Sequence, residues 1–264
     1  LQSLYTLTLA FVTFGLCSSS VYITNDLLDL ESDRKHPRKR NRPFAAAKLP
    51  ISSGVLLAPI LLVMSFSLGA IVSTNFLIVL VIYFSLTTIY SFLLKRIILI
   101  DTLTLALLFT LRIIAGAAAI SIPMSFWLMA FTVFIFLSLA LVKRYAELIV
   151  QAEAGNNASH GRGYRVADTS IVQTLGVSAG YISVIIIALY VHSEDVISLY
   201  ALPEAIFLAL PVLLFWISWV WLKASRGEMH DDPIVFATKD KASLAVAGVT
   251  AIVFFIAANG LGSL

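Results

Sequence analysis

The sequence predicts an all-α protein, a multi-pass transmembrane helical bundle with eight spans, and three observations support this. Of the 264 residues, 59% are hydrophobic and 12% are charged, whereas soluble domains carry about 25% charged residues. The apolar residues gather in eight segments, each close to the ~20 residues that a helix needs to cross a bilayer. The connections between neighbouring segments contain helix breakers such as Pro50, Pro123 and Pro203.

The expected helices follow one another along the whole chain. They cover residues 4–29, 52–73, 76–94, 99–120, 124–146, 170–191, 203–223 and 242–262. No segment between them has the alternating pattern of a strand, so all of the predicted structure is helical. The one cysteine, Cys17, lies in an apolar run, where we expect it to fill space.

The basic residues indicate how the bundle crosses the membrane. Of the 18 Lys and Arg residues, all but Arg112 lie in 34–48, 95–96, 143–165 and 223–241. With eight spans these four segments share one side, which the positive-inside rule places in the cytoplasm. An alternative for most of these residues is that they serve only topology and attraction to anionic lipid.

The end of the first predicted helix carries several polar residues on one face. At 100° per residue, Asn25, Asp26, Asp29 and Asp33 fall within an arc of about 100°. Such carboxylates repel one another unless a metal or a positive side chain sits between them, and oxygen donors suit Mg²⁺. The pattern therefore predicts a Mg²⁺ site. The alternative is a helix-end cluster that pairs with the Arg and Lys residues that follow.

The basic segment 34–48 directly follows these carboxylates and is denser than membrane orientation requires. Carboxylates beside cations suit a Mg²⁺–phosphate ligand, because the metal takes oxygen donors and the remaining phosphate oxygens take Lys and Arg. The sequence therefore predicts that a phosphorylated substrate binds at this end of the bundle.

Arg112 lies midway along an otherwise apolar helix, where an unpaired charge is costly. It therefore faces either a cavity near a phosphate or a carboxylate, or a structural partner on another helix. We do not expect it to pair with Asp101, because Asp101 is three turns away on the same helix. Lys95 and Arg96 end the third helix, where snorkelling to the interface would also explain them. For Asp101 two alternatives remain, a helix cap and a functional role.

The fifth helix ends in a charged segment. Lys143 and Glu147 are four residues apart and share a face, which allows a simple helical ion pair, while Arg144 and Tyr145 turn away from that face. The glycine-containing loop that follows, residues 155–169, either closes over a site or merely connects two helices.

A second polar loop joins the last two helices. Asp231 and Asp232 precede Pro233, which favours a turn. The neighbouring His230 is compatible with a metal, but no second His lies nearby in the sequence, and we do not expect it to be a ligand.

The pattern Asn25-Asp26-x-x-Asp29-x-x-x-Asp33, followed by Arg42-Pro43, resembles the first aspartate-rich motif of the UbiA superfamily of intramembrane prenyltransferases. Members of that family usually have nine helices, with the motif after the second. Here the motif follows the first. The resemblance therefore implies that residues 1–264 form a single UbiA-like transferase domain that lacks the family's first helix.

Several segments are similar to the polyprenyl-phosphate (decaprenyl-phosphate) phosphoribosyltransferase branch, among them YSFLLKRIILID, LRIIAGAAA and KRYAEL. Aromatic prenyltransferases of the superfamily have a second DxxxD motif near the position of Lys143 to Glu147, which holds a second Mg²⁺. This chain has KRYAE there, with one acidic residue. The departure favours transfer of phosphoribose over transfer to an aromatic acceptor.

The resemblance implies a mechanism. Mg²⁺ held by Asp26 and Asp29, with Asn25 and Asp33 in support, would bind the diphosphate of phosphoribosyl pyrophosphate. A polyprenyl phosphate among the helices would attack the ribose carbon. The phosphate oxygens would be held by basic residues, and we count further residues beside the site as substrate-binding or catalytic: Lys35, Arg38, Arg42, Lys95, Arg112, Lys143, Arg144, Tyr145 and Glu147.

Other functions remain open. A prenyl diphosphate could replace phosphoribosyl pyrophosphate as the donor, with an aromatic or other hydrophobic acceptor. A transporter or channel is a further alternative, although the candidate ligands crowd onto one membrane face and not the midplane. We expect an integral protein of the bacterial inner (plasma) membrane with its site facing the cytoplasm and no nucleic-acid partner. The oligomeric state stays open.

Overall fold

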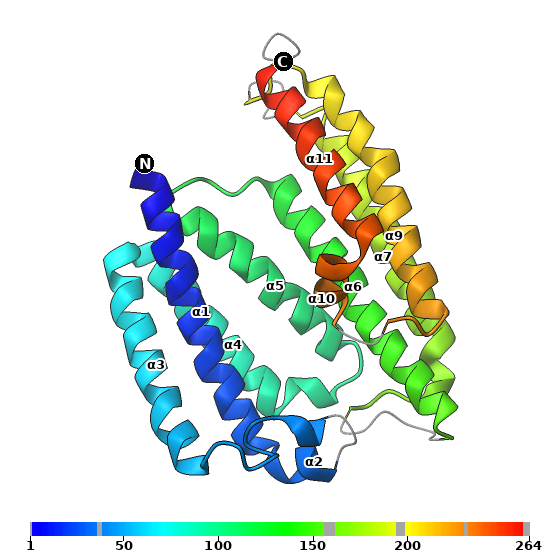
Figure 1. Cartoon of the computed structure of the whole chain (residues 1–264). Coiled ribbons are helices and arrows are strands. Elements are labelled where there is room, and N and C mark those ends of the chain that lie inside the picture. The colour runs from blue at the N-terminus through cyan, green and yellow to red at the C-terminus, as the bar shows by residue number, and fades with distance from the viewer. Residues whose placement is uncertain (1, 36–38, 156–161, 194–198, 230–231, 261–264) are drawn as a thin grey trace. The chain divides into compact units, whose positions relative to one another are not determined.

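The computed structural model describes residues 2–35, 39–155, 162–193, 199–229 and 232–260. These residues form helices and connecting turns, with no strand among them (Figure 1). Eight of the described helices are long and apolar enough to cross a membrane, from Ser3–Leu28 to Lys241–Asn259. The predicted fold class and the eight spans are therefore confirmed.

The helices divide between two compact units. Unit 1 comprises Leu1–Leu94 and Leu111–Met124, and unit 2 comprises Lys95–Thr110 and Ser125–Leu264. Helix α5 (Ile100–Ala119) gives its first half to unit 2 and its second half to unit 1. The expectation of a single transferase domain that lacks a first helix stays a prediction.

Unit 1 is built on α1 (Gln2–Leu28), which packs against α3 (Ile51–Val72) and α4 (Thr74–Phe92) (Figure 1). The short helices α2 (Leu30–Lys35) and η1 (Lys39–Asn41) follow α1. Hydroxyl groups link the apolar helices: Ser20 Oγ donates to the Ala58 carbonyl at 2.7 Å, and Ser65 Oγ donates to the Thr13 carbonyl at 2.8 Å. Such bonds stabilise helix pairs in a bilayer, where apolar burial favours neither state.

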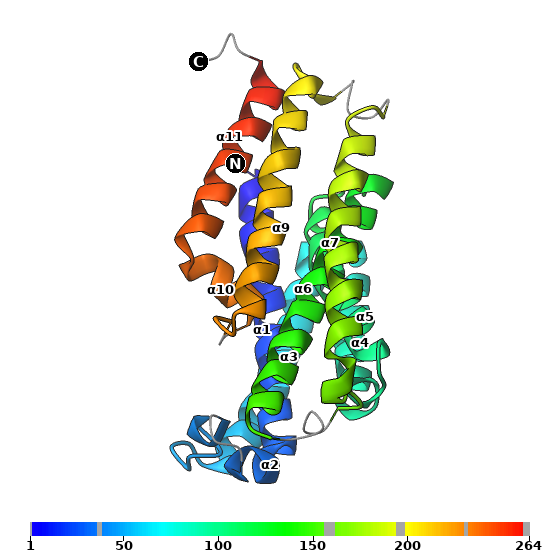
Figure 2. The ribbon, with the colours of Figure 1, turned by 90° about the vertical axis from the view of Figure 1, so that its right-hand side faces the viewer.

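Unit 2 contains the remaining spans, and Figure 2 shows its helices α7, α9 and α11 running alongside one another. α6 packs against α7 and α9, and α9 packs against α11. The η2 helix (Leu94–Arg96) begins at the last residue of unit 1. The other helices of unit 2, besides the first half of α5, are α6 (Phe126–Glu153), η3 (Val166–Asp168), α7 (Thr169–Tyr190), η4 (Pro203–Leu208), α9 (Ala209–Ser225), α10 (Pro233–Lys239) and α11 (Lys241–Asn259).

Small residues allow α6, α7 and α9 to approach closely. A Cβ atom added at Gly176 would lie 2.1 Å from the Trp221 ring, and one at Gly180 would lie 2.6 Å from Ile217. The Trp221 indole donates to Ser138 Oγ at 3.1 Å, and Ser138 donates in turn to the Gly176 carbonyl at 2.7 Å. Glycine is therefore required where the indole crosses α7, and this packing fixes the position of α6 in unit 2.

Asp240 caps the last span. Its carboxylate accepts hydrogen bonds from the Ser243 backbone at 2.8 Å and from the Trp219 indole at 3.1 Å. Burial alone raises the pKa of Asp240, but the bonds from Ser243 and Trp219 and the charge of Lys223 outweigh it, so that the pKa lies below its usual range. The stabilising contribution of this carboxylate is thus lost only as pH falls through the lowered pKa.

The described boundaries of the spans lie within four residues of the predicted ones except at the end of α6, and the predicted end of the last helix at residue 262 lies outside the described residues. The sequence predicts an end near residue 146, but α6 continues to Glu153. The prediction followed hydropathy, which falls at Lys143, whereas the segment AELIVQAE consists mainly of good helix formers. The added turns carry Glu147, which becomes part of a charged cluster.

Candidate functional site

The acidic motif lies where α1 passes into α2 in unit 1. Asp29 separates the two helices, but the helical path continues, because Asp29 N donates to the Asn25 carbonyl at 2.9 Å and Asp33 N donates to the Asp29 carbonyl at 2.8 Å. Asp26 and Asp33 are seven residues apart and therefore lie on the same side of this path. The predicted common face of these two carboxylates is thus present in the structure.

Arg42 lies between these two carboxylates. Its Nη1 atom donates to Asp26 Oδ1 at 2.9 Å and to Asp33 Oδ2 at 2.7 Å. The Asp33 side chain is 1% exposed, while those of Asp26 and Arg42 are 24% and 38% exposed. A positive side chain therefore offsets part of the negative charge of the motif, and two oxygens from different carboxylates converge within 3 Å of one nitrogen atom.

Other members of the predicted metal and phosphate set lie apart from this contact or outside the described residues. Asn25 lines a small cavity of about 160 Å³ formed by α1, α3 and α4. Arg38 and the side chain of Lys35 lie outside the part of the chain that the structure describes. Among the residues that it does describe, no three His, Cys, Asp or Glu side chains form a ready metal site. The roles assigned to these residues stay predictions.

Arg112 lies in the half of α5 that belongs to unit 1. Its Nη2 atom donates to the phenol oxygen of Tyr83 at 3.0 Å, and that oxygen lies 3.2 Å from Ser18 Oγ. The guanidinium also lies over the rings of Tyr83 and Phe14, at 5.4 and 6.0 Å from their centroids, a range in which cation–π attraction operates. The residue lines a cavity and also has a partner on another helix, Tyr83 of α4, so each of the two alternatives describes part of its surroundings, and a place beside a phosphate stays a prediction.

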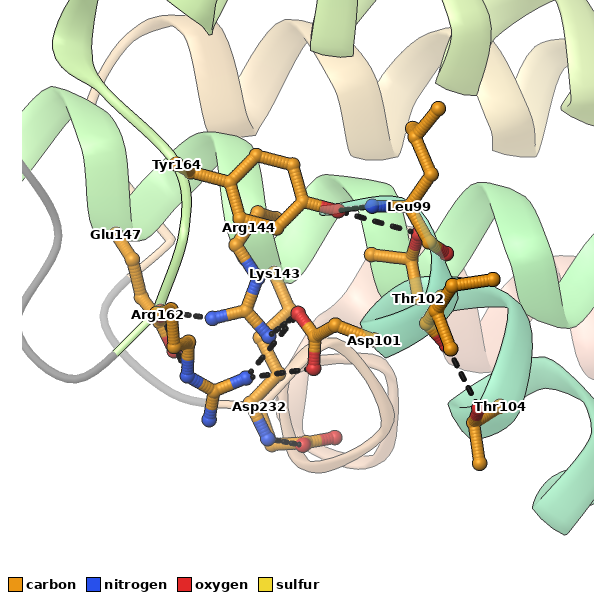
Figure 3. A network of polar contacts seen from close by, with 11 residues as sticks. Leu99, Asp101, Thr102, Thr104, Lys143, Arg144, Glu147, Arg162, Tyr164 and Asp232 are labelled. Carbon is orange, nitrogen blue, oxygen red and sulfur yellow. Dashed lines mark hydrogen bonds and ion pairs between the residues drawn. The ribbon is translucent and has the colours of Figure 1, made fainter. Parts of the chain in front are cut away.

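A buried ion pair forms the centre of a second charged cluster, in unit 2. Arg144 Nη2 lies 3.0 Å from Asp101 Oδ2, and both side chains are 0% exposed. Arg162 approaches the other oxygen of Asp101 at 3.1 Å. Glu147 forms an ion pair with Arg144 and lies 4.0 Å from Arg162 Nε (Figure 3). Two arginines and two acidic residues therefore neutralise one another.

The loop before α7 packs into this cluster. The phenol oxygen of Tyr164 accepts a hydrogen bond from Leu99 N at 2.9 Å, and the Arg144 guanidinium lies 5.7 Å from the centroid of its ring. Gly163 lets the loop approach, because a Cβ there would lie 2.9 Å from the Arg96 carbonyl. The described end of the loop is thus part of the packed cluster (Figure 3), whereas the sequence left open whether it acts as a lid or a connector.

Lys143 extends the cluster toward α10. Its Nζ atom donates to Asp232 Oδ2 at 2.6 Å, and Asp232 Oδ1 accepts from Ile234 N at 3.1 Å, which caps α10. The alternative of a Lys143–Glu147 helical pair is therefore wrong: Lys143 reaches α10, and Glu147 turns to Arg144. The neighbouring His230 and Asp231 lie outside the described residues.

The remaining predicted residues occupy different environments. Lys95 is the first residue of unit 2 and lies in η2. Tyr145 is 6% exposed and packs edge-on against Trp221 in the core of unit 2, and its predicted contact with substrate stays a prediction. Of the two alternatives for Asp101, a helix cap alone does not describe it, since Asp101 is the buried partner of Arg144 and Arg162.

Sequence reasoning did not identify three members of the second cluster: Arg162, Tyr164 and Asp232. They come from the two polar loops, and neither loop has a spacing that marks a site. The available signal was the pair of glycines around Arg162, which allows a close approach, and the proline after Asp232, which favours the start of a helix.

The chain is similar to known proteins. The sequence model of the UbiA prenyltransferase family matches residues 1–239. Nodulation protein NoeC of Azorhizobium caulinodans is 37% identical over 243 residues, which cover 89% of this chain and 77% of that protein. Decaprenyl-phosphate phosphoribosyltransferase of Mycobacterium tuberculosis is 36% identical over 147 residues, 56% of this chain and 49% of that one. Apart from NoeC, the chain spans about half the length of the curated relatives it matches.

A solved structure has a similar fold. The UbiA homolog from Archaeoglobus fulgidus bound to GPP and Mg²⁺ matches with a TM-score of 0.70. The match covers 94% of this chain and 84% of that chain, at 14% sequence identity. At this identity the likeness shows the fold alone.

The buried ion pair leads to a prediction about the stability of the folded protein. We expect Asp101→Asn to destabilise the folded protein by about 3–5 kcal/mol, because it leaves the Arg144 charge buried without its full counter-charge. Unfolding in detergent by denaturant would measure this. Glu228→Gln, which removes the partner of Lys223 at a surface, is the control and should cost about 0–1 kcal/mol. Equal stability of the two variants would show that the ion pair does not hold unit 2 together.

Proposed function

The chain belongs to the UbiA prenyltransferase family, and from this membership and the two charged clusters we propose that it transfers phosphoribose from phosphoribosyl pyrophosphate to a polyprenyl phosphate and releases diphosphate. The similarity to the decaprenyl-phosphate phosphoribosyltransferase of Mycobacterium tuberculosis supports this substrate class. The reaction forms a bond between a phosphate oxygen of the lipid and carbon 1 of the ribose, and it breaks the bond between that carbon and the diphosphate.

The observation that carries the proposal is the Asp101–Arg144 pair. Arg144 stands in the segment where aromatic prenyltransferases of the superfamily have a second pair of aspartates. Here Asp101 and Glu147 are both engaged by Arg144 and Arg162, and Asp232 is engaged by Lys143. Asp101 and Arg144 are fully buried, and separating them to admit a metal would leave charges uncompensated in the interior, so this region differs in charge from a site with two metals.

The motif in unit 1 fits Mg²⁺ by its donor set. Asp26 and Asp33 already direct oxygens to one cationic nitrogen, and Mg²⁺ is bound by one or two carboxylates together with phosphate oxygens and water. In this proposal Asp26 and Asp33 hold the ion, with Asp29 and Asn25 nearby. The ion, when bound, offsets the negative charge that collects on the departing diphosphate.

Arg42 has a role of its own in this proposal. Its guanidinium is 38% exposed, so Arg42 would turn to phosphate oxygens if Asp26 and Asp33 held a cation. Lys143, about as exposed as Arg42, and Lys95 are further phosphate contacts. Arg144 is fully buried and acts as a positioning residue for Arg162 and Glu147.

The lipid substrate supplies the nucleophile. A phosphate monoester is already ionised near pH 7, because its second pKa is about 6. The proposal therefore needs no strong general base, which suits a site rich in arginine and lysine. The membrane keeps the chain of the acceptor among the spans, and the basic loops place the reacting end at the cytoplasmic side.

One other donor has support of its own. The Archaeoglobus protein with the similar fold was solved with GPP bound, which is a prenyl diphosphate, and the same metal and cations would serve the same leaving group. Transfer of a prenyl group is therefore the second candidate. Membership of a transferase family disfavours a transporter or channel.

The substrates can be tested directly. Purified full chain with Mg²⁺, phosphoribosyl pyrophosphate labelled in the ribose, and decaprenyl phosphate should yield label that enters the organic phase. Chelation of Mg²⁺ should abolish this transfer. Label that stays aqueous, while labelled GPP is transferred to an acceptor in the same preparation, would reject the phosphoribosyl proposal in favour of the prenyl one.

The proposed metal ligands can be tested by substitutions that replace one carboxylate oxygen with an amide nitrogen. We expect Asp26→Asn to lower turnover by about a hundredfold or more, because charge stabilisation of this kind contributes about 10²–10³ in rate. Steady-state assays at several Mg²⁺ concentrations would measure the change. Glu31→Gln is the matched control, since Glu31 is an exposed carboxylate of the same segment. Equal losses in the two variants would remove the special role of Asp26.

A further inference from the structure

Unit 1 contains a cavity of about 740 Å³ that the proposed reaction does not yet use. Residues of α1, α4 and α5 line it, and most of them are apolar, including Phe11, Phe14 and Phe76, while Thr8 and Ser18 add hydroxyl groups. Arg112 is its single charged lining residue among those described. The volume falls in the range of roughly 300–1,000 Å³ of pockets that enclose one small ligand.

The cavity has a polar end and an apolar end. Ser18 and Arg112, which both contact the Tyr83 phenol, mark the polar end. Along α1 the lining continues to Leu7, eleven residues away, which at ~1.5 Å per residue is roughly 16 Å. An elongated space with a guanidinium at one end matches an amphiphile that has one apolar chain and an anionic head.

Two glycines keep this space open. Gly15 and Gly116 both line the cavity, and a Cβ added at either position would meet no described heavy atom within 4 Å. Glycine is therefore not required at these positions by packing within the protein, in contrast to Gly176. Side chains there would occupy the cavity itself.

The place of the polar end suits the proposed chemistry. Ser18 and Asp26 lie on the same helix, eight residues or about 12 Å apart. This distance leaves room for a ribose and a diphosphate between a phosphate held at Arg112 and a metal held at the aspartates. The head of the amphiphile therefore lies on the side of the cavity that faces the aspartate motif along α1.

We propose that this cavity binds the polyprenyl phosphate acceptor, with the phosphate at Arg112 and the first part of the chain along Gly15 and Gly116, which determine how much chain is accommodated. The inference rests on the proposed function for the identity of the acceptor. Because the chain of decaprenyl phosphate is longer than this cavity, only its first part is accommodated here. Arg112 pairs with the phosphate by charge-assisted hydrogen bonds.

The test compares binding of decaprenyl phosphate and geranyl phosphate to purified full chain in detergent. Each buried chain methylene contributes about a fourfold factor in affinity. We therefore expect Gly116→Leu and Gly15→Leu, whose side chains displace several chain carbons, to lower the preference for decaprenyl phosphate over geranyl phosphate by about tenfold or more. Gly248→Leu is the matched control, because a Cβ at Gly248 also meets nothing within 4 Å and Gly248, on α11, is not part of this lining.

The head group is tested by a second comparison. Wild type should prefer decaprenyl phosphate over decaprenol, and Arg112→Gln should lose most of that preference. Thermal unfolding of each variant shows whether it is folded. If both glycine variants fold and keep the chain preference of the wild type, or if a bilayer phospholipid displaces decaprenyl phosphate at equal concentration, the inference is overturned.

The outcomes separate this inference from the proposed function. Absence of phosphoribosyl transfer, with an intact and glycine-dependent preference for decaprenyl phosphate, would reject the proposed function but support the cavity as the binding site of the lipid chain. Normal transfer with an unchanged chain preference in the glycine variants would keep the function and reject the cavity.

Discussion

Charge compensation at the polar ends of apolar helices is the constraint on which the rest of this structure depends. Carboxylates placed there are stable only beside a cation, and in both units the cation in the structure is an arginine. In unit 1, Arg42 bridges Asp26 and Asp33. In unit 2, Arg144 and Arg162 enclose Asp101. In both units arginine thus offsets the charge of aspartate, but Arg144 is fully buried and Arg42 is partly exposed.

That difference in burial separates an exchangeable site from a closed one. Arg42 is partly exposed, and under the proposed function a metal with its phosphate ligand would take its place beside Asp26, so that the arginine would then contact the phosphate. Arg144 and Asp101 are fully buried, and separating them would leave a charge uncompensated in the interior, at a cost of several kcal/mol. The arginine that pairs with Asp101 in unit 2 is therefore held in place by burial, whereas Arg42 in unit 1 is partly open to solvent.

Much of this could be predicted from the sequence, because the bilayer restricts the chain so strongly. Apolar run lengths predict eight helices, and helical periodicity brings Asp26 and Asp33 to one side. The partners of Arg144 and Lys143 could not be predicted in this way. Arg162, Tyr164 and Asp232 reach them from loops that are distant in sequence, and a loop's path depends on packing, such as the contact that Gly163 permits. The end of α6 was also missed, since hydropathy marks the membrane boundary and not the end of the helix.

The most direct test of the central claim is to count the divalent ions that the folded chain binds. Titration of the purified full chain with Mn²⁺, followed by electron paramagnetic resonance in the presence of a non-hydrolysable diphosphate analogue, measures this number. We predict one tightly bound ion per chain, and its loss in Asp26→Asn. A second tightly bound ion that survives Asp26→Asn and disappears in Glu147→Gln would contradict this claim, because the carboxylates of unit 2 would then be ligands and not the counter-charges of Arg144 and Arg162.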